Sequence, residues 1–371
     1  MQIYLDYNAS TPIDPQVAAV VQQALQAGFG NPSSSHWAGA PAHAMVELAR
    51  QQVADLLGCS PTEIVFTSGG SESNNLALKG RYFAAQKPGA HIITTQVEHP
   101  AIVEPCRFLE RLGARISWLP VDATGRVDPD DLRKAVTTHT VLISIMHANN
   151  EVGTIQPIAD CANIAREQGI AFHTDAAQSV GKIPTRVDDL GVDLLTIAGH
   201  KLYAPKGVGA LYIRDGIEVE PLIHGAGHER GLRAGTESAM LDMALGKACQ
   251  LASDLTAVAD MQGLRDRLWN ALEGRLGDRV VLNGHPGERL PNTLNVSFVD
   301  RIGAEILEKM PGVAASTGSA CHSGLVELSP VLKAMGVSPE VGSGAIRFSL
   351  GRATSEAEID TVIEQLLQVV R

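Results

Sequence analysis

The sequence is poor in the features that mark secreted, membrane-spanning and nucleic-acid-binding proteins. Its 371 residues include only five cysteines, which are scattered and never spaced Cys-x-x-Cys, so we expect neither a disulfide framework nor a bound metal. No apolar run is long enough to span a bilayer, and no basic stretch followed by an apolar core opens the chain. The formal net charge of −11 argues against nucleic-acid or anionic-membrane partners. We therefore expect a cytoplasmic protein.

What the chain does contain is a succession of short apolar runs and helical patterns. A length of 371 residues favours two domains, and a hydrophobic share of 44% suffices for a sizeable core. Strand patterns alternate with helical patterns over about 200 residues, which indicates a mainly parallel α/β sheet. A helical region from residue 237 to about residue 276 then leads into a second, smaller domain. The predicted strands cover residues 63–68, 91–98, 115–119, 140–146, 169–174, 192–198 and 210–214 in the first domain and 280–282, 293–298 and 345–349 in the second.

Two of the predicted strands end on side chains that suggest a cofactor site. Asp175 follows the run at 169–174, and Lys201 follows the run at 192–198. Ligands of open α/β sheets sit at the carboxyl ends of strands, so both side chains would face one crevice. A lysine that forms a Schiff base and an aspartate that pairs with a pyridinium nitrogen are typical of pyridoxal 5′-phosphate (PLP) sites. Taken alone, the lysine also fits a solvated charge and the aspartate a helix N-cap.

A glycine-rich turn supplies a candidate phosphate site. Residues 63–68 have a strand pattern, and Gly69, Gly70 and Ser71 then open a helix. The free backbone N–H groups and the dipole of a helix favour an anion at such a start. The same residues also fit an ordinary capped helix after a tight turn, because glycine-rich matches are weak on their own.

A loop of small residues around Cys321 is the second chemical feature. Gly, Ser and Ala flank this cysteine within residues 315–324, which favours an exposed thiol over a buried one. His322 beside it would favour the thiolate, which is the nucleophilic form. A Cys-His pair can also be half of a metal site, but no partner pair at ligand spacing accompanies it.

Taken together, these motifs make the chain resemble the cysteine desulfurases, which are class V, fold-type I PLP enzymes. The resemblance covers nearly the whole chain, and the Gly-Ser-Ala-Cys loop is similar to that of the family's first group. It implies an α/β fold with a large PLP-binding domain at residues 14–255, and a smaller α+β domain at residues 1–13 and 256–371 that carries the cysteine loop. The matching stretches are residues 6–12, 66–75, 98–99, 147–151, 173–181, 199–201, 228–236, 318–321 and 346–352.

The resemblance also implies roles for individual residues. Lys201 would hold PLP and later move the substrate Cα proton, while Asp175 would keep the pyridine nitrogen protonated. His99 would stack on the ring and act as acid or base, and Cys321 would take the substrate sulfur as a persulfide. In this family the phosphate-binding threonine, here Thr236, comes from the second subunit, which implies a homodimer. The other implied contacts are Gln178 with the ring oxygen, Gly70, Ser71 and His200 with the phosphate, Asn150 with cofactor and substrate, and Arg347 with the substrate carboxylate.

Two departures from the family pattern keep a sister activity open. Ala198 stands where many desulfurases have a phosphate-binding serine, and His322 stands where Thr or Ser is typical. Both features are similar to selenocysteine lyases, whereas residues 228–231 look more like the desulfurases. The leading prediction is conversion of L-cysteine to L-alanine, with sulfur passed to an unidentified acceptor protein, as in iron–sulfur cluster assembly. A selenocysteine lyase is the alternative, and a transaminase or a non-catalytic sulfur-trafficking subunit fits the motifs less well.

Overall fold

A seven-stranded sheet lies at the centre of the computed structural model, which describes residues 2–317, 321–322, 325–326 and 328–370, with only the backbone at 321–322 and 325–326. The strand order is β2 (Ile64–Thr67), β8 (Gly209–Ile213), β7 (Leu194–Ala198), β6 (Ala171–Asp175), β5 (Thr140–Ser144), β3 (His91–Thr95) and β4 (Arg115–Leu119). All neighbouring strands are parallel except β8, which is antiparallel to both β2 and β7. The predicted mainly parallel α/β sheet is confirmed.

Helices cover both faces of this sheet, because its central strands are apolar in both directions. The helices are α1 (Pro15–Ala27), α2 (Gly39–Leu57), α3 (Gly70–Ala84), α4 (Pro100–Arg111), α5 (Pro129–Ala135), α6 (Ile158–Glu167), α7 (Val187–Leu190) and α8 (Ala239–Ala252). In β5, Ile143 joins a core with α2, α6 and α8, whereas its neighbour Leu142 joins a second core with α3 and α4. Both faces are therefore closed, and ligands can approach only the strand ends.

Helix boundaries follow the capping residues in the sequence. Asp14 accepts a hydrogen bond from the backbone N–H of Gln16 at the start of α1, and α2 ends where Gly58 adopts a φ of +70°. The helical region predicted from residue 237 to about 276 is interrupted, which corrects that prediction. α8 ends at Ala252, and a new helix, α9 (Thr256–Leu276), begins after Leu255. The Thr256 N–H donates a hydrogen bond to the Asp254 side chain at 2.9 Å.

A second core forms around a three-stranded antiparallel sheet in the C-terminal part of the chain. Its strands, in spatial order, are β14 (Ala345–Ser349), β10 (Thr293–Phe298) and β9 (Val280–Asn283). α9 and α13 (Glu356–Val369), which starts with a capping box formed by Ser355 and Glu358, contribute to this core. Ile3 and Leu5 belong to the same core, because β1 (Ile3–Tyr4) pairs in parallel with β11 (Val313–Ala314). This core is separate from the two cores that flank the large sheet.

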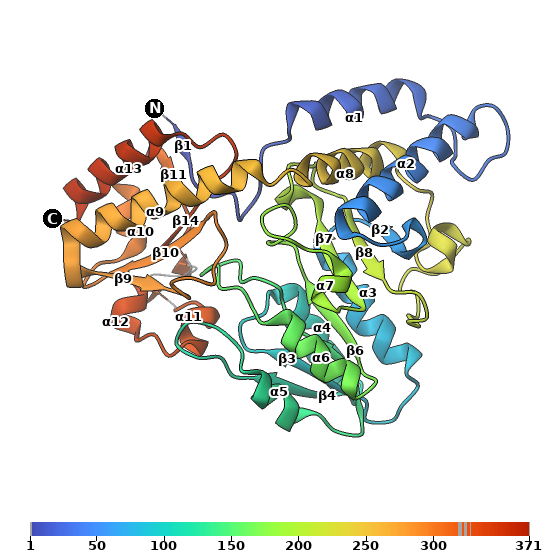
Figure 1. The fold of residues 1–371 in the computed structure, drawn as a ribbon, viewed down its shortest axis with the longest axis horizontal. Coiled ribbons are helices and arrows are strands. Elements are labelled where there is room, and N and C mark those ends of the chain that lie inside the picture. Colours follow the sequence, from blue (N-terminus) through green and yellow to red (C-terminus); the bar gives the residue numbers. More distant parts are fainter. Residues whose placement is uncertain (1, 318–320, 323–324, 327, 371) are drawn as a thin grey trace.

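The remaining described elements in this C-terminal unit are short. They are α10 (Gly303–Glu308), α11 (Pro330–Ala334), α12 (Pro339–Gly342) and the paired strands β12 (Cys321–His322) and β13 (Leu325–Val326). Figure 1 shows both chain ends on this unit, so the N-terminal segment must cross from it to α1 on the other side of the molecule. That crossing brings residues 6–12 past the end of the large sheet.

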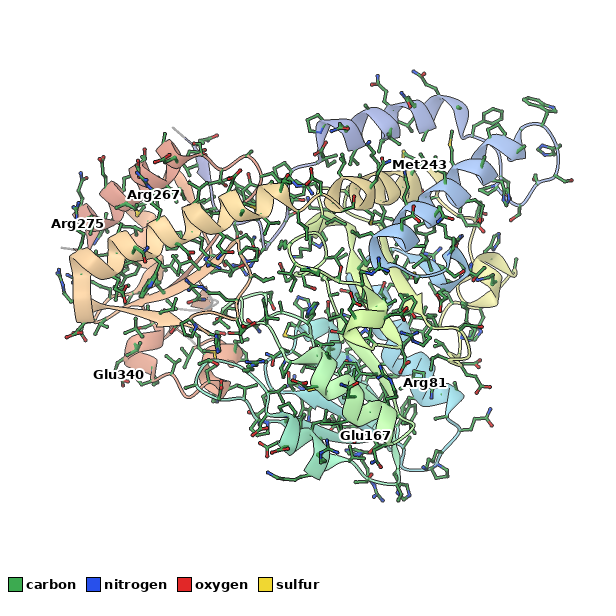
Figure 2. The ribbon with its side chains drawn as sticks, in the orientation of Figure 1. Arg81, Glu167, Met243, Arg267, Arg275 and Glu340 are labelled. Atoms are coloured by element: carbon green, nitrogen blue, oxygen red, sulfur yellow. The ribbon has the colours of Figure 1, made fainter. Side chains whose placement is uncertain are left out.

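Both charged and large apolar side chains, among them Trp37 and Phe29, are exposed on the outside of the molecule. Figure 2 shows charged side chains such as Arg267, Glu167 and Glu340 at the periphery of the ribbon. In the described part of the chain, none of the helices combines the length and the apolar character needed to cross a membrane.

Candidate active site

Asp175 and Lys201 lie at the same edge of the large sheet. Asp175 is the last residue of β6, and Lys201 ends a short 3₁₀ turn (Gly199–Lys201) that follows β7, the neighbouring parallel strand. Both line one cavity of about 650 Å³, a size that accommodates a small-molecule cofactor with its substrate. The other predicted site residues in the cavity lining are Gly70, Ser71, His99, Asn150, Gln178, His200 and Arg347.

Two predicted residues stand apart from this group. Thr236 lines a different hollow, beside Gly207 and Val208. Cys321 has no described side chain, so the predicted role of its thiol lies outside the described residues. The described flanks of its segment are hydrogen-bonded to Arg347, which lines the cavity, and to Glu151, which follows the lining residue Asn150. Ser316 pairs with Arg347 through two backbone hydrogen bonds of 3.2 and 2.7 Å. On the other side, the Ser329 hydroxyl donates to Glu151 at 2.6 Å.

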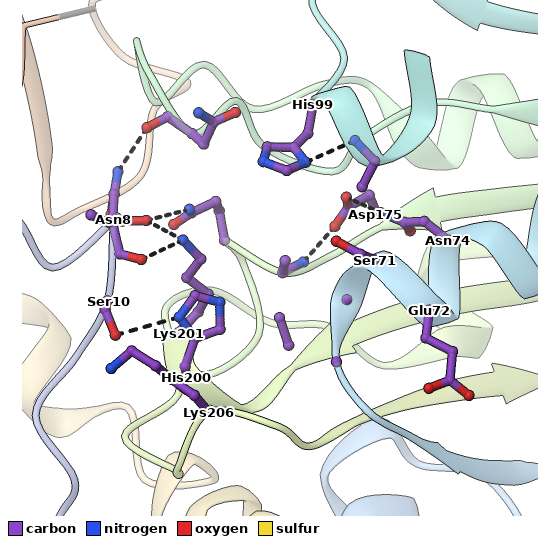
Figure 3. A pocket seen from close by; sticks show the side chains of 18 of the residues that line it. Asn8, Ser10, Ser71, Glu72, Asn74, His99, Asp175, His200, Lys201 and Lys206 are labelled. Atoms are coloured by element: carbon purple, nitrogen blue, oxygen red, sulfur yellow. Dashed lines mark hydrogen bonds between the residues drawn. The ribbon is translucent and has the colours of Figure 1, made fainter. Parts of the chain in front are cut away.

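The Asp175 carboxylate is held at both of its oxygens. Its Oδ2 accepts a hydrogen bond from Nδ2 of Asn74 at 2.6 Å, and its Oδ1 accepts from the backbone N–H of Ala177 at 3.0 Å. Each oxygen keeps a further lone pair for a ligand in the cavity. Figure 3 shows Asn74 reaching Asp175 from α3. Asn74 was not predicted as a site residue; its place in the first turns of the helix after Gly69 was the available indication.

The Lys201 amine lies against the backbone of the N-terminal segment. Its Nζ donates to the carbonyl oxygens of Asn8 at 2.6 Å and Ala9 at 2.8 Å. Burial lowers the pKa of Lys201 to about 8, and the nearby charge of Arg347 adds to this effect, while Asp175 opposes it. At that pKa roughly a tenth of the amine is neutral at pH 7. The neutral amine is the form that attacks an aldehyde.

Two histidines in the cavity are held in their neutral form. His99 caps α4, and its Nδ1 accepts the Ala101 N–H at 3.1 Å, which leaves the ring hydrogen of the neutral form on Nε2. Burial lowers the pKa of His99, and Lys201 adds to this while Asp175 opposes it. Burial also lowers the pKa of His200 to about 4, helped by the charges of Lys201 and Lys206. At neutral pH both rings therefore present an uncharged face or edge to a ligand.

The start of α3 adds a polar part to the wall of the cavity that carries Asp175 and Lys201. Gly69 has a φ of +145°, a conformation that only glycine adopts readily, and it turns the chain from β2 into the helix. A Cβ atom on Gly70 would lie 3.1 Å from the Cβ of Ala198, so the helix start sits close to the end of β7. The first N–H groups of a helix have no intrahelical partner and attract anions. Together with His200, this wall fits a phosphate group.

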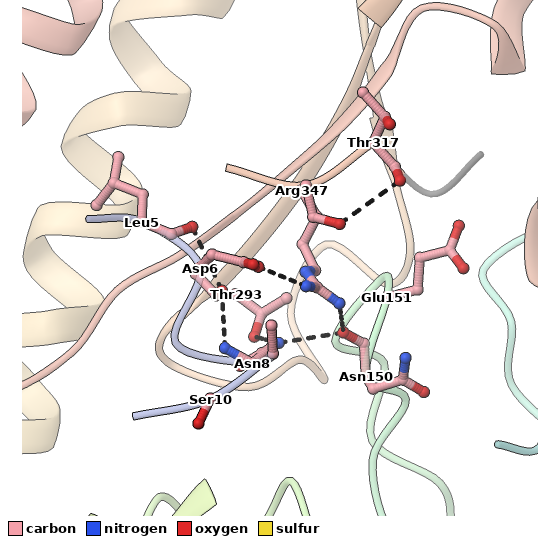
Figure 4. A network of polar contacts seen from close by, with 12 residues as sticks. Leu5, Asp6, Asn8, Ser10, Asn150, Glu151, Thr293, Thr317 and Arg347 are labelled. Carbon is pink, nitrogen blue, oxygen red and sulfur yellow. Dashed lines mark hydrogen bonds and ion pairs between the residues drawn. The ribbon is translucent and has the colours of Figure 1, made fainter. Parts of the chain in front are cut away.

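The wall across the cavity from the sheet edge is built from segments that are far apart in the sequence. Arg347 of β14 reaches the cavity, and its Nη2 lies 2.6 Å from Oδ1 of Asp6. Its Nη1 donates to the carbonyl oxygen of Asn150 at 3.0 Å (Figure 4). The Nε atom of Arg347 is buried without a hydrogen-bond partner in the described part of the chain. Asp6 lies in a stretch that carried the family resemblance, but no role was predicted for it.

Asn8 joins the two walls. Its side-chain Nδ2 donates to Thr293 at 2.8 Å and to the carbonyl oxygen of Asn150 at 3.2 Å. Its backbone carbonyl accepts hydrogen bonds from Gln178 at 3.0 Å and from Lys201. The sequence did not predict that Asn8 links the two walls, because nothing local to residues 6–12 indicates which distant segments they contact.

The donor set fits PLP. An amine of lowered pKa matches its aldehyde, the twice-anchored carboxylate matches its pyridine nitrogen, and the helix start matches its phosphate. The neutral imidazole of His99 can stack on an aromatic ring. The cavity also holds a guanidinium with an unsatisfied N–H, which suits the carboxylate of an amino-acid substrate.

Known proteins resemble this chain over its whole length. The sequence model of the family described as Aminotransferase class-V matches residues 3–362. Cysteine desulfurase IscS from Dictyoglomus turgidum is 49% identical over 373 residues, covering 100% of this chain and 94% of that protein. A NifS-like protein of known structure superimposes with a TM-score of 0.93 at 37% identity, covering 100% of this chain and 99% of the other. The structure of SspA in complex with cysteine gives a TM-score of 0.85 at 37% identity, covering 96% and 100%.

Proposed function

We propose that this chain, which belongs to the aminotransferase class-V family and within it to the cysteine desulfurases, converts L-cysteine to L-alanine with PLP as its cofactor. The sulfur passes first to Cys321 as a persulfide and then to an acceptor. The observation that carries the proposal is the single cavity that brings together Lys201, Asp175 and Arg347. The similarity to a protein whose structure holds cysteine supports the choice of substrate.

The chain's own residues divide the work around the cofactor. Bound PLP supplies an electron-accepting ring that weakens bonds at the α-carbon of an amino acid attached to it. Lys201 would hold the aldehyde end and, after the substrate displaces it, move the proton at Cα. Asp175, fixed by Asn74 and the Ala177 N–H, would keep the proton on the pyridine nitrogen. His99 would stack on the ring, with its Nε2–H available for a substrate atom.

Substrate binding would fall to Arg347 and Asn150. Arg347 is held by Asp6 on one side and by the Asn150 carbonyl on the other, so its guanidinium is oriented before a substrate arrives. A planar guanidinium binds a carboxylate through paired hydrogen bonds, and this fixes the amino acid relative to the cofactor. The side chain of Asn150 lies at the same cavity and would complete the carboxylate site.

The sulfur step needs no external oxidant. The Cys321 thiolate attacks the substrate sulfur, an S–S bond forms, and the substrate C–S bond breaks with its electron pair left on carbon. That carbon takes up one proton to become the methyl group of alanine. One thiol and one cysteine thus give one persulfide and one alanine. An acceptor thiol would then remove the outer sulfur, and we propose an acceptor protein for this step.

The test of the function is alanine formation by PLP-loaded protein, from cysteine and from selenocysteine in parallel. Wild type should form alanine from cysteine, and Cys321→Ala should bind PLP normally but release no sulfide. Cysteine turnover that is unchanged in Cys321→Ala would contradict the persulfide route. Protein that takes up no PLP would contradict the function as a whole.

One observation keeps selenocysteine in this test. The methyl group of Ala198 lies at the start of α3, where a serine would present a hydroxyl to the phosphate. If selenocysteine is turned over by orders of magnitude faster than cysteine, the chain is a selenocysteine lyase. Ala198→Ser and His322→Thr would then be the substitutions to examine. Comparable rates on the two substrates would exclude that specificity.

We also propose that the protein is a homodimer in which Thr236 of the partner subunit completes the phosphate site. Thr236 lies outside the cavity lining of its own chain, which supports this arrangement. A mixed dimer of Lys201→Ala and Thr236→Ala subunits would contain one intact site, so mixing the two variants should restore activity that neither has fully. No gain on mixing would contradict the shared site.

A cytoplasmic location stays a prediction from the sequence.

A further inference from the structure

A buried lysine outside the predicted catalytic set lies directly behind the cavity wall. Lys182 is only 7% exposed and follows β6 in the same segment as Gln178. Its Nζ lies 3.0 Å from Oε1 of Gln178 and 3.3 Å from Oδ1 of Asn8. Both neighbours are neutral amide oxygens. A buried lysine is uncommon and costly without a carboxylate partner, so its place beside two site residues points to a function.

The surroundings of Lys182 contain positive charge rather than negative charge. Burial lowers the pKa of Lys182 to about 7, and the positive charges of Lys201 and Arg347 add to this effect. On its other side it lines a void of about 10 Å³ together with Tyr7, Met261 and other residues, among which there is no carboxylate. Within the described residues, its partners are therefore the two amide oxygens alone, and it forms no ion pair.

The two neighbours of the Gln178 side chain fix which way its amide group faces. The Lys182 amine offers N–H donors, which require the oxygen Oε1 on that side. The Asn8 carbonyl can only accept, so it requires the nitrogen at 3.0 Å to be Nε2. Both contacts demand the same orientation. Nε2 carries a second hydrogen, and since Gln178 lines the cavity, that hydrogen remains for a ligand.

We propose that Lys182 is a positioning residue: its hydrogen bond to Oε1 holds the Gln178 amide so that Nε2 donates to the anionic ring oxygen of PLP. This inference rests on the proposed function, because it needs PLP in the cavity. The residue touches neither cofactor nor substrate and acts through Gln178. Without it, Oε1 would be buried without a donor, and the amide would lose the contact that sets its orientation.

A spectroscopic property of the cofactor reports this arrangement. With PLP held by Lys201, the ring oxygen would share the proton of their linkage, and a donor to that oxygen would weaken its hold on the proton. Loss of the Gln178 donor should therefore raise the pH at which the proton leaves. The visible absorption of the PLP-loaded protein changes at that pH, so the midpoint can be measured without turnover.

The experiment is a double-mutant cycle of Lys182→Met and Gln178→Ala. K182M, which keeps the side-chain volume but has no donor, should raise the absorption midpoint by about 0.5 to 1 pH unit and weaken PLP binding several-fold. In the Q178A background, K182M should cause no further shift in midpoint, because the residue through which it acts is gone. Lys134→Met, at a lysine 74% exposed, is the matched control and should leave the midpoint unchanged.

Two results would overturn the proposal. One is a K182M midpoint equal to that of wild type. The other is a K182M shift of the same size with and without Gln178, which would mean that the charge acts on the linkage directly. If K182M does not fold, K182Q goes through the same cycle. It keeps an N–H donor, so a wild-type midpoint or a shift that needs Gln178 supports the proposal, and a shift that persists in Q178A overturns it.

The failure of this inference can be told apart from failure of the proposed function. Wild-type protein that binds no PLP, or that binds PLP and forms no alanine from cysteine, fails the proposed function. Wild-type protein that does both, with a K182M midpoint that does not move, fails only the inference about Lys182.

Discussion

The two walls of the cavity are built in different ways. On the sheet-edge wall, made of Asp175, Lys201, His99 and the start of α3, each residue lies at the end of a strand, in the short turn after a strand, or at the start of a helix. On the cross-domain wall, made of Asp6, Asn8, Asn150 and Arg347, side-chain hydrogen bonds join segments that are up to 341 residues apart. The first wall is therefore set by local chain direction, and the second only by the packing of two units.

This difference predicts a division of labour. The sheet-edge wall carries the groups that would hold the cofactor, and the backbone fixes them even when a neighbouring side chain changes. The cross-domain wall carries the group that would hold the substrate, and it depends on a few polar contacts. The walls are coupled electrostatically, because Arg347 lowers the pKa of Lys201 across the cavity. Substitutions on either wall can test this comparison.

The largest effect is expected from Lys201→Ala on the sheet-edge wall. The variant lacks the amine of lowered pKa that would hold the aldehyde, and cysteine turnover should fall by at least about 10³-fold. The fold should persist, because Lys201 contributes two hydrogen bonds to backbone carbonyls and little else. Alanine formation and the visible spectrum measure the outcome. Lys134→Ala is the control, and a K201A protein with the wild-type spectrum would refute the assignment.

The next effect concerns the cross-domain wall and its anchor. Asp6→Asn removes the ion pair with Arg347, and charged hydrogen bonds of this kind contribute about 1.5 to 3 kcal/mol, which corresponds to a loss of roughly 10- to 100-fold in kcat/KM. The loss should appear mainly as a higher KM for cysteine, with the PLP spectrum unchanged. Asp360→Asn is the matched control, since Asp360 pairs with Arg267 on the surface. A D6N variant with wild-type KM would show that Arg347 needs no anchor.

A pH profile measures the coupling between the walls. Because burial and Arg347 lower the pKa of Lys201 to about 8, the neutral amine increases as the pH rises toward 8 and levels off above it. The rate at which protein freed of PLP takes the cofactor up again should follow that curve. Arg347→Met removes a positive charge and should move the midpoint to higher pH. A rate that is flat between pH 6 and pH 9 would contradict the lowered pKa.

The smallest effect is on stability, at a buried acid beside the sheet-edge wall. Burial raises the pKa of Glu98 from its usual 4.5 to about 8, with Asp175 adding to the effect. Between those values the folded state keeps a proton that the unfolded state loses, so stability falls as the pH rises through this window. Glu98→Gln removes that loss, and its Tm should gain about 3 °C relative to wild type on going from pH 6 to pH 9. Glu110→Gln, an exposed site on α4, should show no such gain.

Local patterns predicted most of the sheet-edge wall. The runs at 169–174 and 192–198 are mostly apolar, and parallel strands share one ligand-binding edge, so the residues that follow these runs could be placed together. Gly70 and Ser71 were predicted from a local pattern as well, because they open a helix after a strand pattern. Asn74 was missed, because an asparagine inside a helix has no distinctive pattern. The break between α8 and α9 was missed as well, since Asp254 looked like one polar residue in a long helical region.

The contacts of the cross-domain wall could not be predicted from local sequence patterns. Arg347 and Asn150 came from the family resemblance, and no local feature tied Asp6 or Asn8 to them. Their contacts form only when the N-terminal segment lies between the large sheet and β14. Lys182 illustrates the same limit. Its sequence neighbourhood suggests a solvated lysine, and only the fold shows that it is buried against Asn8 and Gln178.

The sequence by itself determined the sheet, the strand ends and the residues that follow them, because period, capping and turn chemistry act over a few neighbouring residues. Tertiary structure decided which of those ends share a cavity with Asp6, Asn8 and Arg347. It also decided the ionisation of Lys201, since a pKa depends on burial and on charges brought near from distant segments. Burial and the nearness of distant charges exist only in the folded chain. Because of them, the polar residues at the strand ends form a site that can hold a cofactor and its substrate.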